Sequence, residues 1–184
     1  MWALLRPLLF ALDPERAHGL TVRLVQGAGA VPPIRGLLGL AYRAAEAPVE
    51  VFGLRFRNRL GLAAGWDKDG LAFRGLTALG LGHVEVGTVT PRPQPGNPKP
   101  RVFRLKADRS VINRMGFPSR GADFLAARLG SRPEGLVVGV NLGKNKDTPN
   151  ERALGDYGAL LERFAPLADY LVVNVSSPNT QGLR

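Results

Sequence analysis

The 184-residue sequence predicts an α/β fold built on a parallel sheet. Short apolar segments alternate with helical ones in the order strand, helix, strand, loop, helix, strand, helix, strand. The strand segments are apolar on both faces, which is typical of parallel strands covered by helices. Polar residues crowd the carboxyl ends of these strands, in the runs "GWDKDG", "GTVT", "NLGKNKDT" and "NVSSPNT". In barrels of parallel strands, that end carries the chemistry.

Residues 1–45 are predicted to form a pair of helices that precedes the α/β part, residues 46–184. Asp13 is the expected N-cap of the second helix, with Pro14 at its first helical position. The pair is apolar on one face and carries five basic residues against two acidic ones. It is therefore expected to lie on a membrane or on a partner, although a helical cap packed on the main domain is the alternative. Arg6 and Pro7 interrupt the first apolar stretch, which argues against a signal peptide.

The remaining elements follow in order along the chain. Two short runs around Gly53 and Asn58 predict a hairpin, and the segment after Pro91 reads as a long basic loop that reaches about Pro118. Four strand–helix units make only half of an eight-stranded barrel. The predicted strands are 60–64, 83–90, 135–143 and 169–177, and the predicted helices are 70–82, 119–130 and 150–168.

The composition limits the kinds of chemistry and partner. The formal net charge is +10, which favours anionic partners such as nucleic acid, a phosphorylated cofactor or an acidic membrane. Residues 91–120 hold eight basic side chains against one acid, but few aromatic residues interleave with them and no nucleic-acid-binding motif is present. We therefore expect no nucleic-acid partner. The absence of cysteine excludes disulfides, zinc–thiolate sites and thiol nucleophiles.

Five segments occur together and in one order: "LAAGWDKDG", "VEVGTVTPRPQPGNPKPRVFRL", "VINRMGF", "VNLGKNKDTP" and "VVNVSSPNTQGLR". They resemble the signature segments of the dihydroorotate dehydrogenase family, and with "LDPERAH" they are most similar to its membrane-associated, quinone-reducing class. The resemblance implies a (β/α)8 TIM barrel, of which this chain covers about the first four units. Because half of that barrel would be missing, the 184 residues alone are expected neither to hold the cofactor tightly nor to catalyse.

The resemblance also implies an activity. It is the oxidation of (S)-dihydroorotate to orotate in pyrimidine biosynthesis, with hydride passing to FMN and electrons then passing to a membrane quinone. A monomer bound peripherally to the cytoplasmic face of the cell membrane through its N-terminal helices is expected, with no metal. Two other hypotheses are an FMN-dependent tRNA dihydrouridine synthase, which relies on a cysteine that this chain lacks, and a non-catalytic half-barrel that binds a membrane or a protein.

Ser177 is the candidate catalytic base, because the soluble class of the family has a cysteine at this position. The alternative is that Ser176 and Ser177 cap a strand before a Pro-Asn turn. His18 and Arg101 match quinone-site positions. The implied substrate-binding residues are Lys68, Asn113, Arg114, Met115, Gly116, Phe117, Asn174 and Asn179. The implied cofactor-binding residues are Ala64, Gly65, Trp66, Asp67, Lys68, Thr88, Asn141 and Asn174.

The residue types suit these roles. Asparagine offers a donor and an acceptor without a titrating charge, which matches a planar ring that carries amide groups. A lysine such as Lys68 can stabilise negative charge that develops on a flavin. Taken singly, an asparagine after a strand is more often a turn residue, and a lysine between two aspartates is more often solvated.

Overall fold

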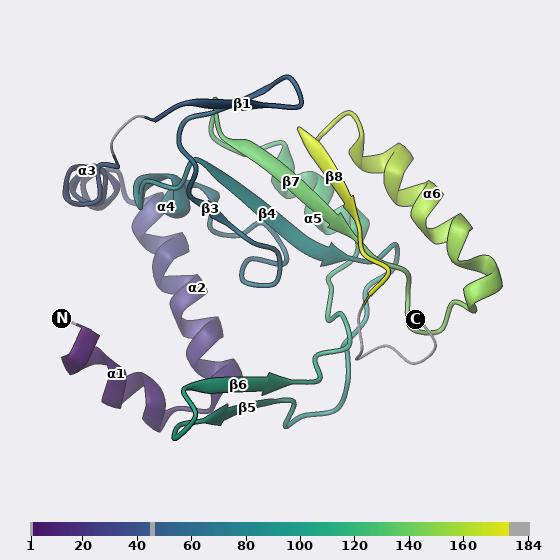
Figure 1. Ribbon diagram of the computed structural model, residues 1–184, viewed down its shortest axis with the longest axis horizontal. Helices are drawn as coiled ribbons and strands as arrows, with labels where there is room; N and C mark the ends of the chain where they lie inside the picture. The colour runs from purple at the N-terminus through teal and green to yellow at the C-terminus, as the bar shows by residue number, and fades with distance from the viewer. Residues whose placement is uncertain (1, 45–46, 177–184) are drawn as a thin grey trace.

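The computed structural model describes residues 2–44 and 47–176. Its centre is a four-stranded sheet, formed by β3 (Gly61–Leu62), β4 (His83–Val89), β7 (Val137–Leu142) and β8 (Tyr170–Val173). The strands lie in the order β3-β4-β7-β8 and all three pairings are parallel (Figure 1). The predicted α/β fold with a parallel sheet is therefore confirmed.

Three helices cover the outer face of the sheet: α4 (Phe73–Ala78), α5 (Ala122–Leu129) and α6 (Ala153–Phe164), the last after a 3-10 turn, η1 (Asn150–Arg152). Alternate residues of a strand point to opposite faces. Val84 and Val86 of β4 consequently join the core beneath the helices, whereas Glu85 and Gly87 face the inner side. The fully buried Phe164 and Leu125 anchor α6 and α5 to this core.

The N-terminal region contains three helices where a pair was predicted: α1 (Trp2–Ala11), α2 (Pro14–Ala30) and α3 (Pro32–Ala41). Asp13 accepts hydrogen bonds from the backbone N–H groups of Glu15 and Arg16, both at 3.0 Å, and so is the N-cap of α2. Pro32 opens α3 directly after an extended Val31, which separates it from α2. The prediction missed this break, although Pro32 and Pro33 mark it in the sequence.

Helix α2 packs closely against α4. A side chain added at Gly75 would overlap the carbonyl oxygen of Val25, so only glycine allows this approach of the two backbones. The predicted helix 70–82 is shorter than expected, because Gly80 has a φ of 85° that a helix cannot continue through.

Two hairpins flank the sheet. The predicted one is β1 (Val49–Val51) and β2 (Leu54–Phe56), which pair antiparallel. The second is β5 (Val102–Leu105) and β6 (Ser110–Asn113), which lies where a continuous loop was predicted. The loop prediction was wrong because each strand is only four residues long and neither alternates apolar with polar residues, the pattern that normally identifies a strand. This second hairpin lies beside α1 and the start of α2 (Figure 1).

Candidate functional site

A cavity of about 450 Å³, here called the central cavity, opens at the carboxyl ends of the parallel strands. Residues of β4, β7 and β6 reach it, as do the segments that follow β3, β6 and β8. Thirteen residues line it: Ala63, Ala64, Gly65, Lys68, Glu85, Thr88, Asn113, Met115, Gly116, Phe117, Pro118, Asn141 and Asn174. Ten of them are residues that the sequence analysis assigned to the substrate or the cofactor.

Three assigned residues within the described part of the chain, Trp66, Asp67 and Arg114, do not line the central cavity. The Arg114 guanidinium donates from Nη2 to the carbonyl oxygen of Pro100 at 3.0 Å on an exposed surface. Asp67 is a backbone cap and Trp66 lines a neighbouring cavity, as described below. The predicted site residues Ser177 and Asn179 lie outside the described residues.

A chain of polar side chains crosses the central cavity from β4 to β8. Glu85 accepts a hydrogen bond from Asn141 Nδ2 at 2.9 Å, which turns the amide oxygen of Asn141 toward Thr88. The Thr88 hydroxyl donates to that oxygen at 2.6 Å, and Asn174 Nδ2 donates to it at 3.2 Å. Burial and the Glu85 carboxylate raise the pKa of Tyr170 to about 12, so its hydroxyl remains a donor to Glu85. Because a carboxylate only accepts, Glu85 fixes the direction of the whole chain.

Small residues form one wall of the central cavity. Ala63, Ala64 and Gly65 follow β3, and Gly65 has a φ of 104°, a conformation that favours glycine. A Cβ at Gly65 would meet nothing within 4 Å, so open space lies beside this backbone. A flat wall of small residues next to amide donors and acceptors suits a planar ring with polar edges. The residues present therefore fit a flavin ring.

Lys68 lies between the central cavity and a second one. Its Nζ donates to the carbonyl oxygen of Gly65 at 2.6 Å. Burial lowers the pKa of Lys68, although nearby Asp69 and Glu15 favour its charged form. With Met115 and Pro118, Lys68 lines both cavities. A cation at this boundary can act on molecules bound on either side.

The second cavity, here called the side cavity, has a volume of about 380 Å³ and lies between α2 and the loop after β3. Both predicted quinone-site residues, His18 and Arg101, line it together with Glu15 and Trp66. His18 Nε2 donates to the carbonyl oxygen of Trp66 at 2.7 Å, and the two rings meet edge to face at a centroid separation of 5.9 Å. Helix α2 is thereby held against the loop that carries Lys68.

Asp67 has a structural role in this loop. Its side chain is 1% exposed, and its two carboxylate oxygens accept from the backbone N–H groups of Leu71 and Ala72, each at 2.8 Å. Burial nevertheless raises the pKa of Asp67. The carboxylate thus caps the chain as it enters α4.

Replacing Asp67 with alanine is expected to lower the free energy of unfolding by about 2–4 kcal/mol, because two buried N–H groups lose their acceptors. Chemical denaturation of the full-length protein measures this change. Asp69→Ala is the matched control, because Asp69 accepts only one long bond, at 3.4 Å from the N–H of Arg120. Equal losses in the two variants would contradict the capping role.

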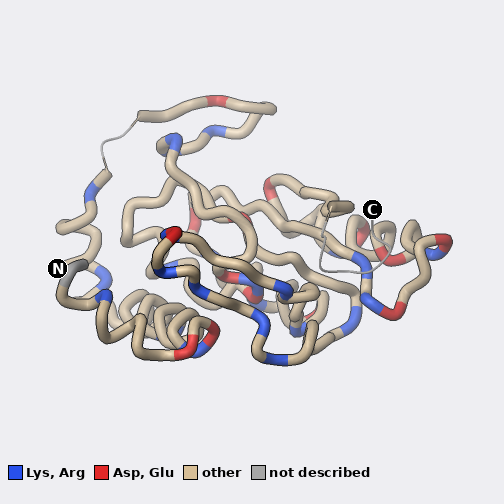
Figure 2. Tube along the Cα trace, turned by 60° about the horizontal axis from the view of Figure 1, so that its bottom comes forward, with Lys and Arg blue, Asp and Glu red and all other residues tan. Residues whose placement is uncertain are grey.

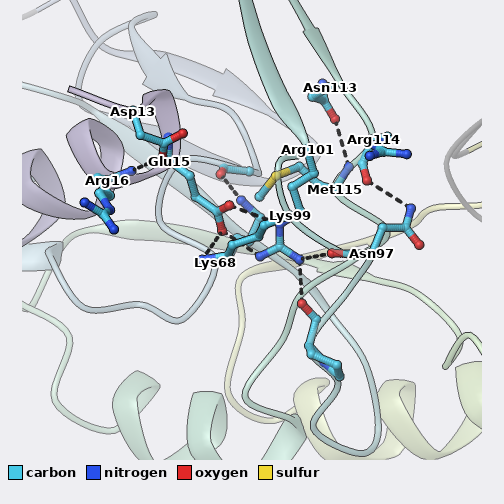
Figure 3. Close-up of polar contacts among 12 residues, drawn as sticks. Asp13, Glu15, Arg16, Lys68, Asn97, Lys99, Arg101, Asn113, Arg114 and Met115 are labelled. Carbon is cyan, nitrogen blue, oxygen red and sulfur yellow. Dashed lines mark hydrogen bonds and ion pairs between the residues drawn. The ribbon is translucent and has the colours of Figure 1, made fainter. Parts of the chain in front are cut away.

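Sequence reasoning missed two acidic residues, Glu15 and Glu85. Glu85 alternates with Gly87 on the inner face of β4, so strand periodicity was the signal available for it. Glu15 precedes His18 by three residues on α2, which places both on one side of the helix. Arg101 donates to both oxygens of Glu15, at 2.6 and 3.2 Å, and Lys99 Nζ lies 3.3 Å from one of them (Figure 3).

The hydrogen bond from Arg101, followed by its charge and that of Lys99, lowers the pKa of Glu15 from its ordinary value of 4.5. Ionised Glu15 therefore stabilises the fold above pH 4.5, and this stabilisation is lost as the pH falls through the lower folded-state pKa. We expect Glu15→Gln to be less stable than the parent at neutral pH and to approach it in acid. Urea unfolding over a pH series measures this, and a stability difference that does not change with pH would contradict it.

Comparison with known proteins places this site in a family. The sequence profile described as "Dihydroorotate dehydrogenase" matches residues 46–184. The dihydroorotate dehydrogenase (quinone) of Acidithiobacillus ferrooxidans is 57% identical over the whole of this chain, and that of Thiobacillus denitrificans is 54% identical. The chain spans about half the length of these relatives, 51% and 53% respectively.

Solved structures agree with the sequence comparison. The crystal structure of the DHODH of Eimeria tenella in complex with ferulenol superposes with a TM-score of 0.80 at 44% identity. It covers 93% of this chain, which in turn covers 46% of that structure. The fold is thus part of the barrel of that enzyme, as the sequence predicted. The chain belongs to the dihydroorotate dehydrogenase family.

Proposed function

We propose that the full-length protein oxidises (S)-dihydroorotate to orotate with FMN as its cofactor and passes the electrons to a membrane quinone. The observation that carries this proposal is the central cavity. It gathers Lys68, Asn113, Phe117, Asn141 and Asn174 from separate segments of a chain that belongs to this family. The quinone-dependent class is supported by the relatives, which are named as quinone enzymes.

On the cofactor side of the central cavity, separate residues would bind the flavin and stabilise its charge. Ala64, Gly65, Thr88 and Asn141 would hold FMN, which when bound accepts the hydride that leaves the substrate. Lys68 would stabilise the negative charge that accompanies this transfer. The two ends of the polar chain, Glu85 and Asn174, keep these contacts fixed before the substrate arrives.

On the substrate side, Asn113, Asn174 and Asn179 would bind the carboxylate and the ring amides. Ser177 would take the proton from the ring carbon alpha to the carbonyl, while hydride leaves the neighbouring carbon, so that a carbon–carbon double bond forms. A serine hydroxyl is a weak base and needs a site closed to bulk water. Phe117 lines the central cavity and would help to exclude water.

The N-terminal helices, residues 1–45 as a unit, would dock on the cytoplasmic face of the membrane. Among the residues that the structure describes, no helix is long and apolar enough to cross a bilayer. Lys and Arg outnumber Asp and Glu and are spread along the chain, which suits contact with anionic lipid (Figure 2). Large apolar side chains are exposed on α1 to α3, namely Leu4, Leu5, Leu8, Leu20, Leu24, Ile34, Leu37 and Leu40.

Anaerobic mixing of the purified full-length protein with dihydroorotate tests the proposal. Bound FMN is expected to lose its oxidised absorbance as orotate forms in equal amount. A protein that binds no flavin, or whose flavin dihydroorotate does not reduce, would refute it.

A further inference from the structure

Two arginines, one just before β5 and one within it, contact the corner between α1 and α2. Arg101 donates hydrogen bonds from Nε and Nη2 to the Glu15 carboxylate. Three residues later, Arg104 donates from Nη1 to the carbonyl oxygen of Leu12 at 2.8 Å, and its guanidinium lies 4.6 Å from the centre of the Phe10 ring. Arg101 lines the side cavity, whereas Arg104 does not. The two contacts therefore anchor the same corner but differ in their relation to the cavity.

The protein itself uses most of the hydrogen-bonding capacity of Arg101. The side chain is 6% exposed, and Nη1 donates to the carbonyl oxygens of Pro95 at 2.6 Å and Asn97 at 2.9 Å (Figure 3). Together with the two bonds to Glu15, these account for four of the five N–H groups that a guanidinium carries. The remaining N–H, on Nη2, has no acceptor among residues 2–44 and 47–176, so it can donate to a ligand.

The orientation of that N–H depends on Glu15. A carboxylate that accepts from both Nε and Nη2 fixes the plane of the guanidinium, which a single acceptor would not do. Lys99 contributes a second cation to the same carboxylate. Without Glu15, these two cations would repel each other, and Arg101 would be left with its two carbonyl partners alone.

The chemistry around the remaining N–H suits a neutral ring with carbonyl oxygens. Val22, Leu71 and Met115 give the side cavity apolar walls. A quinone carbonyl oxygen accepts hydrogen bonds and carries no charge, so one well-aligned N–H can recognise it while the ring packs on these apolar side chains.

We propose that Glu15 is a positioning residue for the quinone, which acts by holding Arg101 with one Nη2 N–H directed at the quinone oxygen in the side cavity. This inference rests on the proposed function. It differs from a purely structural role, in which Glu15 would only fasten α2 to the rest of the molecule. If the role were purely structural, removing the Arg104 contact to the same corner would weaken quinone binding as much as removing Glu15.

The experiment compares four variants of the full-length FMN-loaded enzyme in detergent: Glu15→Gln, Arg101→Lys, the double variant, and Arg104→Ala as the matched control. Binding of a short-chain benzoquinone is measured by equilibrium dialysis, and the quinone KM by steady-state turnover. Flavin reduction by dihydroorotate is followed separately by anaerobic rapid mixing.

Glu15→Gln is expected to weaken quinone binding and to raise the quinone KM by about tenfold, a size typical of losing an aligned hydrogen bond. Flavin reduction should fall by a smaller factor than quinone binding, because Glu15 bonds directly to Arg101 but acts on Lys68 only through its charge, an effect that Asp69 also supplies. Arg104→Ala should lower thermal stability and leave quinone binding unchanged. The double variant should bind quinone about as weakly as Arg101→Lys alone, because Glu15 acts through Arg101.

Unchanged quinone binding in Glu15→Gln, an equal loss in Arg104→Ala, or additive losses in the double variant would each overturn the inference. If Glu15→Gln does not fold, Glu15→Asp, which keeps the charge on a shorter side chain, is held to the same criteria. Failure of dihydroorotate to reduce the flavin of the parent enzyme would refute the proposed function, whereas normal reduction with any of these three results would refute only the role of Glu15.

Discussion

Replacing Ser177 with alanine is expected to lower the rate of flavin reduction by about 10²–10⁴-fold, because a general base contributes that much to a proton transfer. The flavin content of the purified protein should not change, since the Ser177 side chain is not among the groups proposed to hold FMN. Anaerobic rapid mixing with dihydroorotate measures the rate. Ser177→Cys should retain more activity than Ser177→Ala, because a thiolate can accept the same proton.

Ser176→Ala is the matched control for this prediction. The backbone N–H of Ser176 donates to the Asn174 side chain at 3.3 Å, and alanine keeps that contact. Its rate should therefore stay close to the parent rate. A larger loss of rate in Ser176→Ala than in Ser177→Ala would show that Ser177 is not the base.

Replacing Lys68 with methionine is expected to lower the rate of flavin reduction by about 10²–10³-fold, the usual effect of removing a preorganised group that stabilises developing charge. The side chain lines both cavities, and burial already lowers its pKa, so its charge is poorly screened by water. Methionine has a similar length and fills the same space.

Lys144→Met controls for the loss of a buried lysine elsewhere. Lys144 is 2% exposed and donates to the carbonyl oxygen of Thr148 at 2.7 Å, but it lines neither cavity. This variant should be less stable and still reduce its flavin at the parent rate. Similar losses of rate in both variants would show that Lys68 acts through stability alone.

The order of strands and helices could be predicted because each parallel strand is an apolar run that ends in polar residues. The same pattern placed Thr88, Asn141 and Asn174 together, since the carboxyl ends of parallel strands meet at one edge of the sheet. Asn113 and Phe117 could not be placed in that way. They come from the end of β6 and the loop that follows it, and only the resemblance to a family assigned them to the site.

Other features depend on contacts that sequence periodicity does not encode. Arg104 holds the β5–β6 hairpin beside the α1–α2 corner. Apolar side chains of this hairpin are exposed, so its sequence does not alternate between buried apolar and exposed polar residues. Asp67 resembled a cofactor ligand in sequence but is turned inward, because the two N–H groups at the start of α4 require an acceptor. The role of Glu15 depends on Arg101, 86 residues away in the sequence.

The most direct test of the account is to measure orotate formation and quinone reduction together in the full-length enzyme, with dihydroorotate as the only reductant. The two products are expected to form in equal amounts, and under anaerobic conditions orotate formation is expected to stop after a single turnover when the quinone is left out. Sustained orotate formation without quinone, or quinone reduction without orotate, would contradict it.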